Sequence, residues 1–208
     1  MALLLGKHRR PYAERCFFLF VDVVGSTAIT ERLGALEAHR FLAGVLSAVA
    51  EPIELCRGEI YQYVGDEIVI TWVEADGVAD ARALRCSRRT MRRVASYVRQ
   101  QVSSGSSSDE SMRRQPARVI VANHAGEVSQ VRRAIVFHGD VMNTTGRLEQ
   151  ATREVGCFFI ASAQALASVG LPPEIRTHDL GALALRGRVE PIHAFCVEHS
   201  DRSALKSA

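Results

Sequence analysis

In the segment FVDVVGST (Phe20–Thr27), the acid Asp22 ends an apolar run that begins at Cys16, and small residues lead directly into a Ser/Thr helix start. This order predicts a buried strand, a tight loop and a helix. Free backbone N–H groups at the start of such a helix can bind phosphate beside a metal-binding carboxylate. We therefore expect Gly25, Ser26 and Thr27 to contact phosphate and Asp22 to bind a metal ion, although an acid here could also simply cap the helix.

A second acid, Asp66, stands in the Gly-Asp corner of YVGDE (Tyr63–Glu67), between two β-like runs, Glu59–Val64 and Ile68–Trp72. The pattern predicts a β-hairpin. Asp is common in turns because it forms local hydrogen bonds, so this residue alone indicates little. Together with Asp22 it predicts a pair of carboxylates, which could share two Mg²⁺ ions because Mg²⁺ prefers oxygen ligands and substrate phosphates.

The third motif is GDVMNTTGR (Gly139–Arg147), which begins a predicted helix. Asn143 and Arg147 are four residues apart, so they share one helix face. An amide and a guanidinium could thus reach the same substrate, the guanidinium by charge-assisted hydrogen bonds.

With these three motifs in this order, the chain resembles the class III nucleotidyl cyclases, the adenylate and guanylate cyclase catalytic domains, over roughly residues 15–197. The segment LRGRVEP (Leu185–Pro191), which precedes a last apolar strand, extends the resemblance. It implies an α/β (α+β) domain with the ferredoxin-like nucleotidyl cyclase fold, in which helices flank a central, mostly antiparallel sheet. We expect this catalytic domain at residues 15–199, an N-terminal extension at 1–14 and a tail at 200–208.

The resemblance implies conversion of a nucleoside triphosphate, ATP first, to its 3′,5′-cyclic monophosphate and pyrophosphate for second-messenger signalling. Asp22, Asp66 and the backbone carbonyl of Val23 would bind two Mg²⁺ or Mn²⁺ ions per site. One ion would activate the ribose 3′-hydroxyl and the other would hold the triphosphate. The family places these sites between the subunits of a head-to-tail homodimer.

Other roles also follow from the resemblance. Asn143 matches the residue that orients the ribose, and Arg147 matches the one that stabilises transition-state charge on the α-phosphoryl oxygens. Arg186 aligns with a lysine that reaches the terminal phosphates. Arg keeps the charge of that lysine, but the two side chains bind phosphate differently.

The chain departs from the family at the base pocket. Gln62 stands where purine-selective members carry Lys, and Val136 stands where they carry Asp. Gln can both donate and accept, whereas Val offers no side-chain hydrogen bond, so discrimination by polar pairing is weakened. GTP or a pyrimidine triphosphate therefore remains open as the substrate. The connection Gly126–Ala134 also looks shorter than usual, which keeps open a weakly active, regulatory nucleotide-binding module. A diguanylate cyclase is a more distant alternative, because it would lack the Asn/Arg helix.

The remaining pattern alternates as an α/β domain would. Helical spacing begins at Ser26, is interrupted at Gly34 and is expected to end before Pro52. Further expected helices are at Asp80–Val102 and Val141–Ala151, with a flexible loop at Ser103–Ser108. Expected strands are at Arg118–Val121, Val131–Phe137, Cys157–Ser162 and Ile192–Val197.

Composition excludes several classes of function. The net charge of +3 on 208 residues does not favour nucleic-acid binding. No apolar run is long enough for a membrane span, but residues 3–11 resemble the junction that follows a membrane anchor in some bacterial cyclases, so a longer form could carry one. Five scattered cysteines make a disulfide framework or zinc site unexpected, and they favour a cytoplasmic location, or the cytoplasmic membrane face for a longer form. His124 is expected to be packed or hydrogen-bonded.

Overall fold

The computed structural model describes residues 12–103, 119–131, 134–138 and 140–198. The described strands form one eight-stranded sheet. Seven of them are neighbours in the order β2-β3-β1-β4-β6-β8-β7, and β5 also pairs with β4. Only the β4–β6 pairing is parallel among these described strands. The strands are β1 (Tyr12–Val23), β2 (Glu59–Val64), β3 (Glu67–Val73), β4 (Val119–Val131), β5 (Ala134–His138), β6 (Phe159–Ser162), β7 (Thr177–Leu183) and β8 (Ile192–Val197).

The long strand β1 organises the sheet, because it pairs with β3 on one side and with β4 on the other. Its side chains alternate between the two faces of the sheet, as strand geometry requires. Phe17, Leu19 and Val21 belong to the large core cluster, whereas Phe18 and Phe20 belong to a second cluster on the opposite face. Nearly all of these side chains are fully buried.

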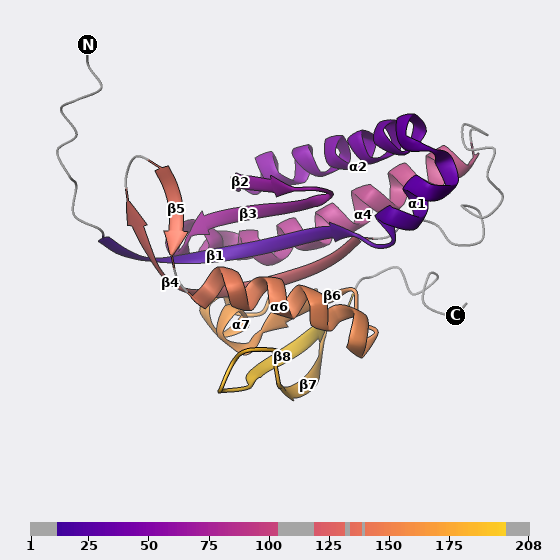
Figure 1. Cartoon of the computed structure of the whole chain (residues 1–208). Helices are drawn as coiled ribbons and strands as arrows, with labels where there is room; N and C mark the ends of the chain where they lie inside the picture. The colour runs from indigo at the N-terminus through magenta and orange to yellow at the C-terminus, as the bar shows by residue number, and fades with distance from the viewer. Residues whose placement is uncertain (1–11, 104–118, 132–133, 139, 199–208) are drawn as a thin grey trace, which may run out of the picture.

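Helices cover both faces (Figure 1). Helices α2 and α4 supply apolar residues to the large cluster, while α6 packs on the face of Phe18 and Phe20. The helical elements are α1 (Ser26–Leu33), α2 (Ala35–Leu55), α3 (Glu74–Val78), η1 (Ala79–Ala81), α4 (Arg82–Ser103), α6 (Asp140–Val155) and α7 (Ala163–Val169). The expected mostly antiparallel sheet flanked by helices is therefore confirmed.

Three expected element boundaries were wrong. Val131 ends β4 and pairs with Ala134 of β5, so it does not begin a strand that runs to Phe137. Helix α2 continues through Pro52 to Leu55, because Pro52 and Ile53 are buried and the Pro52 carbonyl accepts hydrogen bonds from the Cys56 backbone and the Cys86 thiol. Strand β4 is far longer than Arg118–Val121, since it pairs along the whole length of β1. The expected flexible loop lies mostly outside the described residues, as does the tip, at 132–133, of the connection expected to be short.

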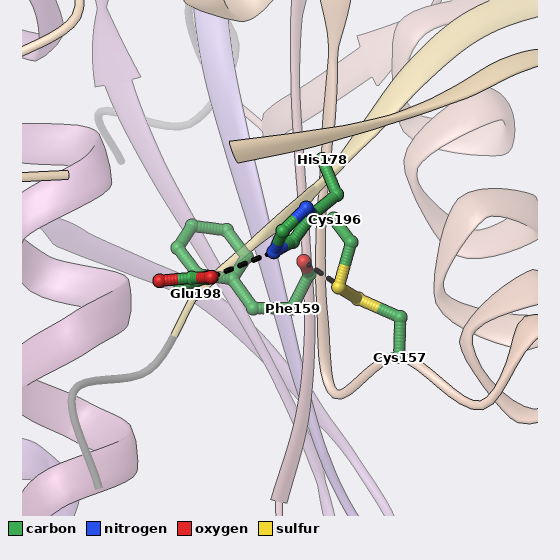
Figure 2. The surroundings of a disulfide bond; sticks show 5 residues. All are labelled: Cys157, Phe159, His178, Cys196 and Glu198. Atoms are coloured by element: carbon green, nitrogen blue, oxygen red, sulfur yellow. Dashed lines mark hydrogen bonds and ion pairs between the residues drawn. A yellow bond between two sulfur atoms is a disulfide. The ribbon is translucent and has the colours of Figure 1, made fainter. Parts of the chain in front are cut away.

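The expectation about cysteines was also wrong, because Cys157 and Cys196 form a disulfide (Figure 2). Cys157 lies two residues before the first residue of β6, Phe159. Cys196 lies on the neighbouring strand β8, opposite Ile160. Their Cα atoms are 6.0 Å apart although 39 residues separate them. The spacing of the two cysteines in the sequence does not indicate that they pair, because they come together only when the sheet forms. The cysteines therefore give no support to a reducing location.

Two other expectations concern a histidine and the membrane. His124 is buried and its Nδ1 is hydrogen-bonded to Ser162 Oγ at 2.7 Å, as expected for a packed histidine. Burial, and secondarily the charge of Arg188, lower the pKa of His124 to about 4, so it is neutral at physiological pH. In the part of the chain that the structure describes, no helix is both long and apolar enough to cross a bilayer.

We predict that reduction of the Cys157–Cys196 disulfide destabilises the domain. A reductant should lower the unfolding free energy of the wild type by about 2–4 kcal/mol, because the disulfide restricts the unfolded chain. The measurement is thermal or denaturant unfolding with and without a phosphine reductant. The double variant Cys157→Ser/Cys196→Ser is the control and should not respond. Equal wild-type stability under both conditions would contradict the prediction.

Candidate active site

The candidate site lies where β1 ends and the β2–β3 hairpin turns. Alternation along β1 places Asp22 on the same face as Phe18 and Phe20, which is the face that α6 covers. Asp66 lies in the two-residue turn between β2 and β3. The two strands that carry these acids to one edge are direct partners, with Val21 opposite Ile68.

The structure brings the two predicted acids together. Burial, the charge of Asp66 and a hydrogen bond with Asp66 raise the pKa of Asp22 to about 6, against the opposing charge of Arg153. Asp22 is only 9 % exposed. Two carboxylates that share a hydrogen bond in a buried place resist carrying two negative charges unless a cation lies nearby.

Two further carboxylates, to which the sequence analysis gave no role, join this cluster. Glu67, at the start of β3, has its pKa raised to about 7 by burial and by the charges of Glu149, Asp22 and Asp66. Glu149, on α6, has its pKa raised to about 7 by burial and by Asp22 and Asp66, against the lowering effect of Arg153. We call Asp22, Asp66, Glu67 and Glu149 the acidic cluster.

The acidic cluster fits a divalent cation in part. The Oδ2 atom of Asp66 is buried and has no hydrogen-bond partner among the described residues, so an acceptor stands ready there. No group of three or more His, Cys, Asp or Glu side chains within the described ranges is arranged to hold a metal by itself. Asp22 and Asp66 would therefore need a backbone carbonyl, such as that of Val23, and substrate phosphate or water to complete the coordination, as is common for Mg²⁺.

Arg153 is the cation of the cluster in this structure. Its Nη2 forms an ion pair and hydrogen bond with Asp22 Oδ2, and it lies 3.1 Å from Glu149 Oε1. The spacing of Glu149 and Arg153, four residues apart, could have suggested a pair on one helix face. Nothing in the sequence indicated that this face meets Asp22.

The loop after Asp22 turns into α1 through a left-handed glycine. Gly25 has φ 74°, a left-handed backbone that favours glycine, and it precedes the first residue of α1, Ser26. No side chain caps α1, and a Cβ on Gly25 would meet nothing within 4 Å. The first turn of α1, which begins with Ser26 and Thr27, therefore has no side-chain cap at Gly25.

Asn143 and Arg147 lie on α6 but not on the face that carries Glu149 and Arg153. Asn143 is exposed and Arg147 is half-buried. At 3.6 residues per turn, the Asn143/Arg147 pair is rotated by about 120° from the Glu149/Arg153 pair. Arg147 faces the β7–β8 loop, where a Cβ on Gly187 would lie 3.3 Å from Arg147 Nη2.

The same loop carries Arg186 and Arg188 on either side of Gly187. Arg186, the predicted phosphate ligand, is exposed. Arg188 instead forms an ion pair with Asp140, and its Nη1 donates to Thr144 Oγ1 at 2.7 Å. Arg188 thus fastens the loop to the first turns of α6, a role that the sequence did not reveal.

The structure does not bring the two predicted base-binding residues onto neighbouring strands. Gln62 is half-buried on β2, next to a register shift in its pairing with β3. Val136 lies on β5, and its side chain is outside what the structure describes. In the sheet order, β3, β1 and β4 separate the two strands.

Known proteins are similar to this chain in sequence and in fold. No family model matches the chain. The chain is 34% identical to "Adenylate cyclase 2" of Rhizobium meliloti (strain 1021) over 194 residues, which are 90% of this chain but 51% of that protein. It thus spans about half the length of this curated relative.

Solved structures of two specificities share the fold. The adenylyl cyclase CyaB from P. aeruginosa superposes with a TM-score of 0.76 at 18% identity, over 93% of this chain and 98% of that chain. The guanylyl cyclase Cya2 superposes with a TM-score of 0.70 at 19% identity, over 96% of this chain and all of the other. The expected cyclase fold is confirmed, and the fold alone does not separate the two bases.

We predict that Glu67→Gln changes the unfolding free energy in a pH-dependent way when a metal chelator is present. The folded-state pKa of Glu67 lies above its ordinary value of 4.5, so the folded state binds more protons than the unfolded state between about pH 4.5 and 7. The contribution of Glu67 to the unfolding free energy therefore falls as pH rises through this window. Gln resembles the protonated acid, so the variant should gain stability over the wild type at pH 8, by about 1 kcal/mol, and little at pH 5.

Thermal unfolding at both pH values measures this difference. The exposed carboxylate Glu59 on β2 provides the control variant Glu59→Gln, whose effect should not depend on pH in this way. A stability difference for Glu67→Gln that is the same at pH 5 and pH 8 would show that Glu67 is not held in a repulsive cluster.

Proposed function

We propose that this chain, which is a relative of adenylate cyclases and has the fold of the class III nucleotidyl cyclase catalytic domain, converts a nucleoside triphosphate to its 3′,5′-cyclic monophosphate and pyrophosphate. ATP is the proposed substrate, and the product would serve as a second messenger. The observation that carries the proposal is the convergence of Asp22 and Asp66 near the uncapped first turn of α1.

Each element of the candidate site has a role in this reaction. Asp22, Asp66 and the Val23 carbonyl would hold two Mg²⁺ or Mn²⁺ ions. When bound, such ions supply the positive charge that makes the ribose 3′-hydroxyl acidic and neutralises the leaving pyrophosphate. The first-turn amides of Ser26 and Thr27, with Gly25 leaving room, would bind the triphosphate.

The residues of α6 and the β7–β8 loop would act on the ribose and the reacting phosphate. The Asn143 amide would orient the ribose so that its 3′-oxygen faces the α-phosphorus. The Arg147 guanidinium would donate hydrogen bonds to the α-phosphoryl oxygens as their charge rises. Arg186, exposed beside Gly187, would bind the terminal phosphates.

The choice of ATP rests on the sequence relative rather than on the fold. The relative at 34% identity is named an adenylate cyclase, whereas the structural neighbours include both adenylyl and guanylyl cyclases. Gln62 could pair with either purine through its amide, and Val136 has no polar group to add to the selection. GTP and pyrimidine triphosphates are therefore the alternative substrates.

We further propose a head-to-tail homodimer with two sites at the interface. Support comes from the two faces of α6. One carries Arg153 to the acidic cluster of its own chain, and the other carries Asn143 and Arg147, of which Arg147 lies beside Gly187 of the β7–β8 loop. One chain would then supply the metal-binding acids of a site, and its partner the Asn/Arg pair. A poorly active, regulatory module is the second candidate, which Gln62 and Val136 favour.

The direct test of the function is incubation of the purified protein with each of the four ribonucleoside triphosphates and Mg²⁺ or Mn²⁺. We expect the 3′,5′-cyclic monophosphate of adenosine as the main product, identified by mass. Asp22→Asn and Asp66→Asn should each reduce the rate by at least about 100-fold, because each removes charge that holds the metal at the reacting phosphate. Circular dichroism checks that the variants fold. Absence of any cyclic product would favour the regulatory module.

The dimer predicts complementation between inactive variants. Asp66→Ala and Arg147→Ala should each be almost inactive alone. When they are mixed, half of the dimers are heterodimers, each with one intact site of two, so about a quarter of wild-type activity should return. Native mass spectrometry confirms subunit exchange.

A matched control uses two lesions of one cluster. Asp22→Ala mixed with Asp66→Ala should recover nothing, since both changes fall on the same half of every site. Recovery in this control, or none in the first mixture despite exchange, would contradict sites shared between subunits.

A further inference from the structure

Resting on the proposed function, we infer that Arg153 is a built-in counter-cation of the acidic cluster: its guanidinium holds Asp22 when no divalent cation is bound and moves onto Glu149 when one binds. Arg153 would thereby weaken metal binding and make it dependent on an exchange of ion pairs. This assigns a positioning role to a residue outside the motifs that carry the proposed chemistry.

Arg153 holds an oxygen of the acidic cluster that a metal ion would bind. Arg153 Nη2 hydrogen-bonds Asp22 Oδ2, one of the oxygens that a metal would take. The Asp22 side chain is 12% exposed, whereas the Arg153 side chain is 50% exposed. The guanidinium therefore reaches the buried acid from the solvent side and has room to leave.

Arg153 also offsets the negative charge of the acidic cluster. Four carboxylates, those of Asp22, Asp66, Glu67 and Glu149, lie near enough to interact electrostatically and to repel one another. Arg153 is the cation that opposes this effect at Asp22, Glu67 and Glu149. Uncompensated buried charges are costly, so the arginine stabilises the cluster when the metal is absent.

Glu149 can accept a hydrogen bond from Arg153 after Arg153 leaves Asp22. It lies four residues before Arg153 on α6, and its Oε1 is 3.1 Å from Arg153 Nη2. Yet this oxygen is buried and has no hydrogen-bond partner among the described residues, so the present contact is an ion pair without hydrogen-bond geometry. A small rotation of the guanidinium toward Glu149 would complete that bond and release Asp22.

A purely structural role is the competing explanation. Arg153 could simply tie the end of α6 to the end of β1, as many ion pairs do. In that case its removal would lower stability equally with and without metal, and the affinity for metal would stay the same. Metal affinity and metal-dependent stability therefore separate the two explanations.

The experiment measures Mn²⁺ binding to the full chain without nucleotide, by calorimetry and by electron paramagnetic resonance. Arg153→Met should bind Mn²⁺ at least about fivefold more tightly than the wild type, because both competition for Asp22 and repulsion of the cation are lost. Thermal unfolding should show a lower midpoint without metal and a larger rise on adding Mn²⁺. Arg93→Met, which removes another half-exposed arginine paired with a carboxylate, Glu51, should change neither quantity.

A double-mutant cycle tests the exchange itself. Glu149→Gln should weaken Mn²⁺ binding in the wild-type background, since Arg153 then loses its second partner and stays on Asp22. The effect should shrink strongly in the Arg153→Met background, where no arginine remains to be displaced. Equal effects of Glu149→Gln in both backgrounds would overturn the exchange, because they would reflect only the loss of one negative charge.

The variant Arg153→Lys keeps the charge without the planar fork, and it serves if Arg153→Met does not fold. Its Mn²⁺ affinity should lie between those of the wild type and the methionine variant. Unchanged Mn²⁺ affinity in both Arg153 variants would overturn the inference while the cyclase activity stood. Tighter binding in a protein that makes no cyclic nucleotide would instead support the inference and reject the proposed function.

Discussion

A buried carboxylate at the end of a central strand is the constraint on which this structure depends. Strand β1 must be apolar on both faces because other strands flank it and helices cover it. Asp22 is an exception, because this acid lies near the end of β1 and is buried beneath α6 instead of exposed to water. Such an acid needs partners that stabilise its charge. The Gly-Asp turn, the last turns of α6 and Arg153 all meet at this point.

The parts of the site that lie close together in the sequence could be predicted, and those made by packing could not. Asp22, the glycine turn and Asp66 are visible because strand, turn and helix signals are local. Glu149 and Arg153 form an ordinary i,i+4 pair in sequence. Their importance comes only from the face of α6 that the apolar residues Val141 and Leu148 bury. Which face of α6 is buried depends on the sheet beneath the helix.

The same distinction explains the errors in the fold. Most strand and helix positions followed from periodicity, but β4 was underestimated because His124, Gly126 and Glu127 interrupt its apolar pattern. Pairing with β1 overrides that local signal. The disulfide could not be foreseen, since it depends on β6 and β8 being neighbours. Arg188 was missed for a similar reason, because its partners Asp140 and Thr144 belong to a distant helix.

The two faces of α6 have a consequence for communication between sites. If one face serves the metal of its own chain and the other serves the partner's nucleotide, then a single rigid helix belongs to both sites of a dimer at once. Any displacement of α6 that accompanies occupancy of one site alters the geometry of the other. The two binding equilibria are then linked thermodynamically, so that an ion bound at one site changes nucleotide affinity at the second by the same factor as the reverse. Cooperativity would in this case need no regulatory domain, because it would be a property of one helix shared by two sites.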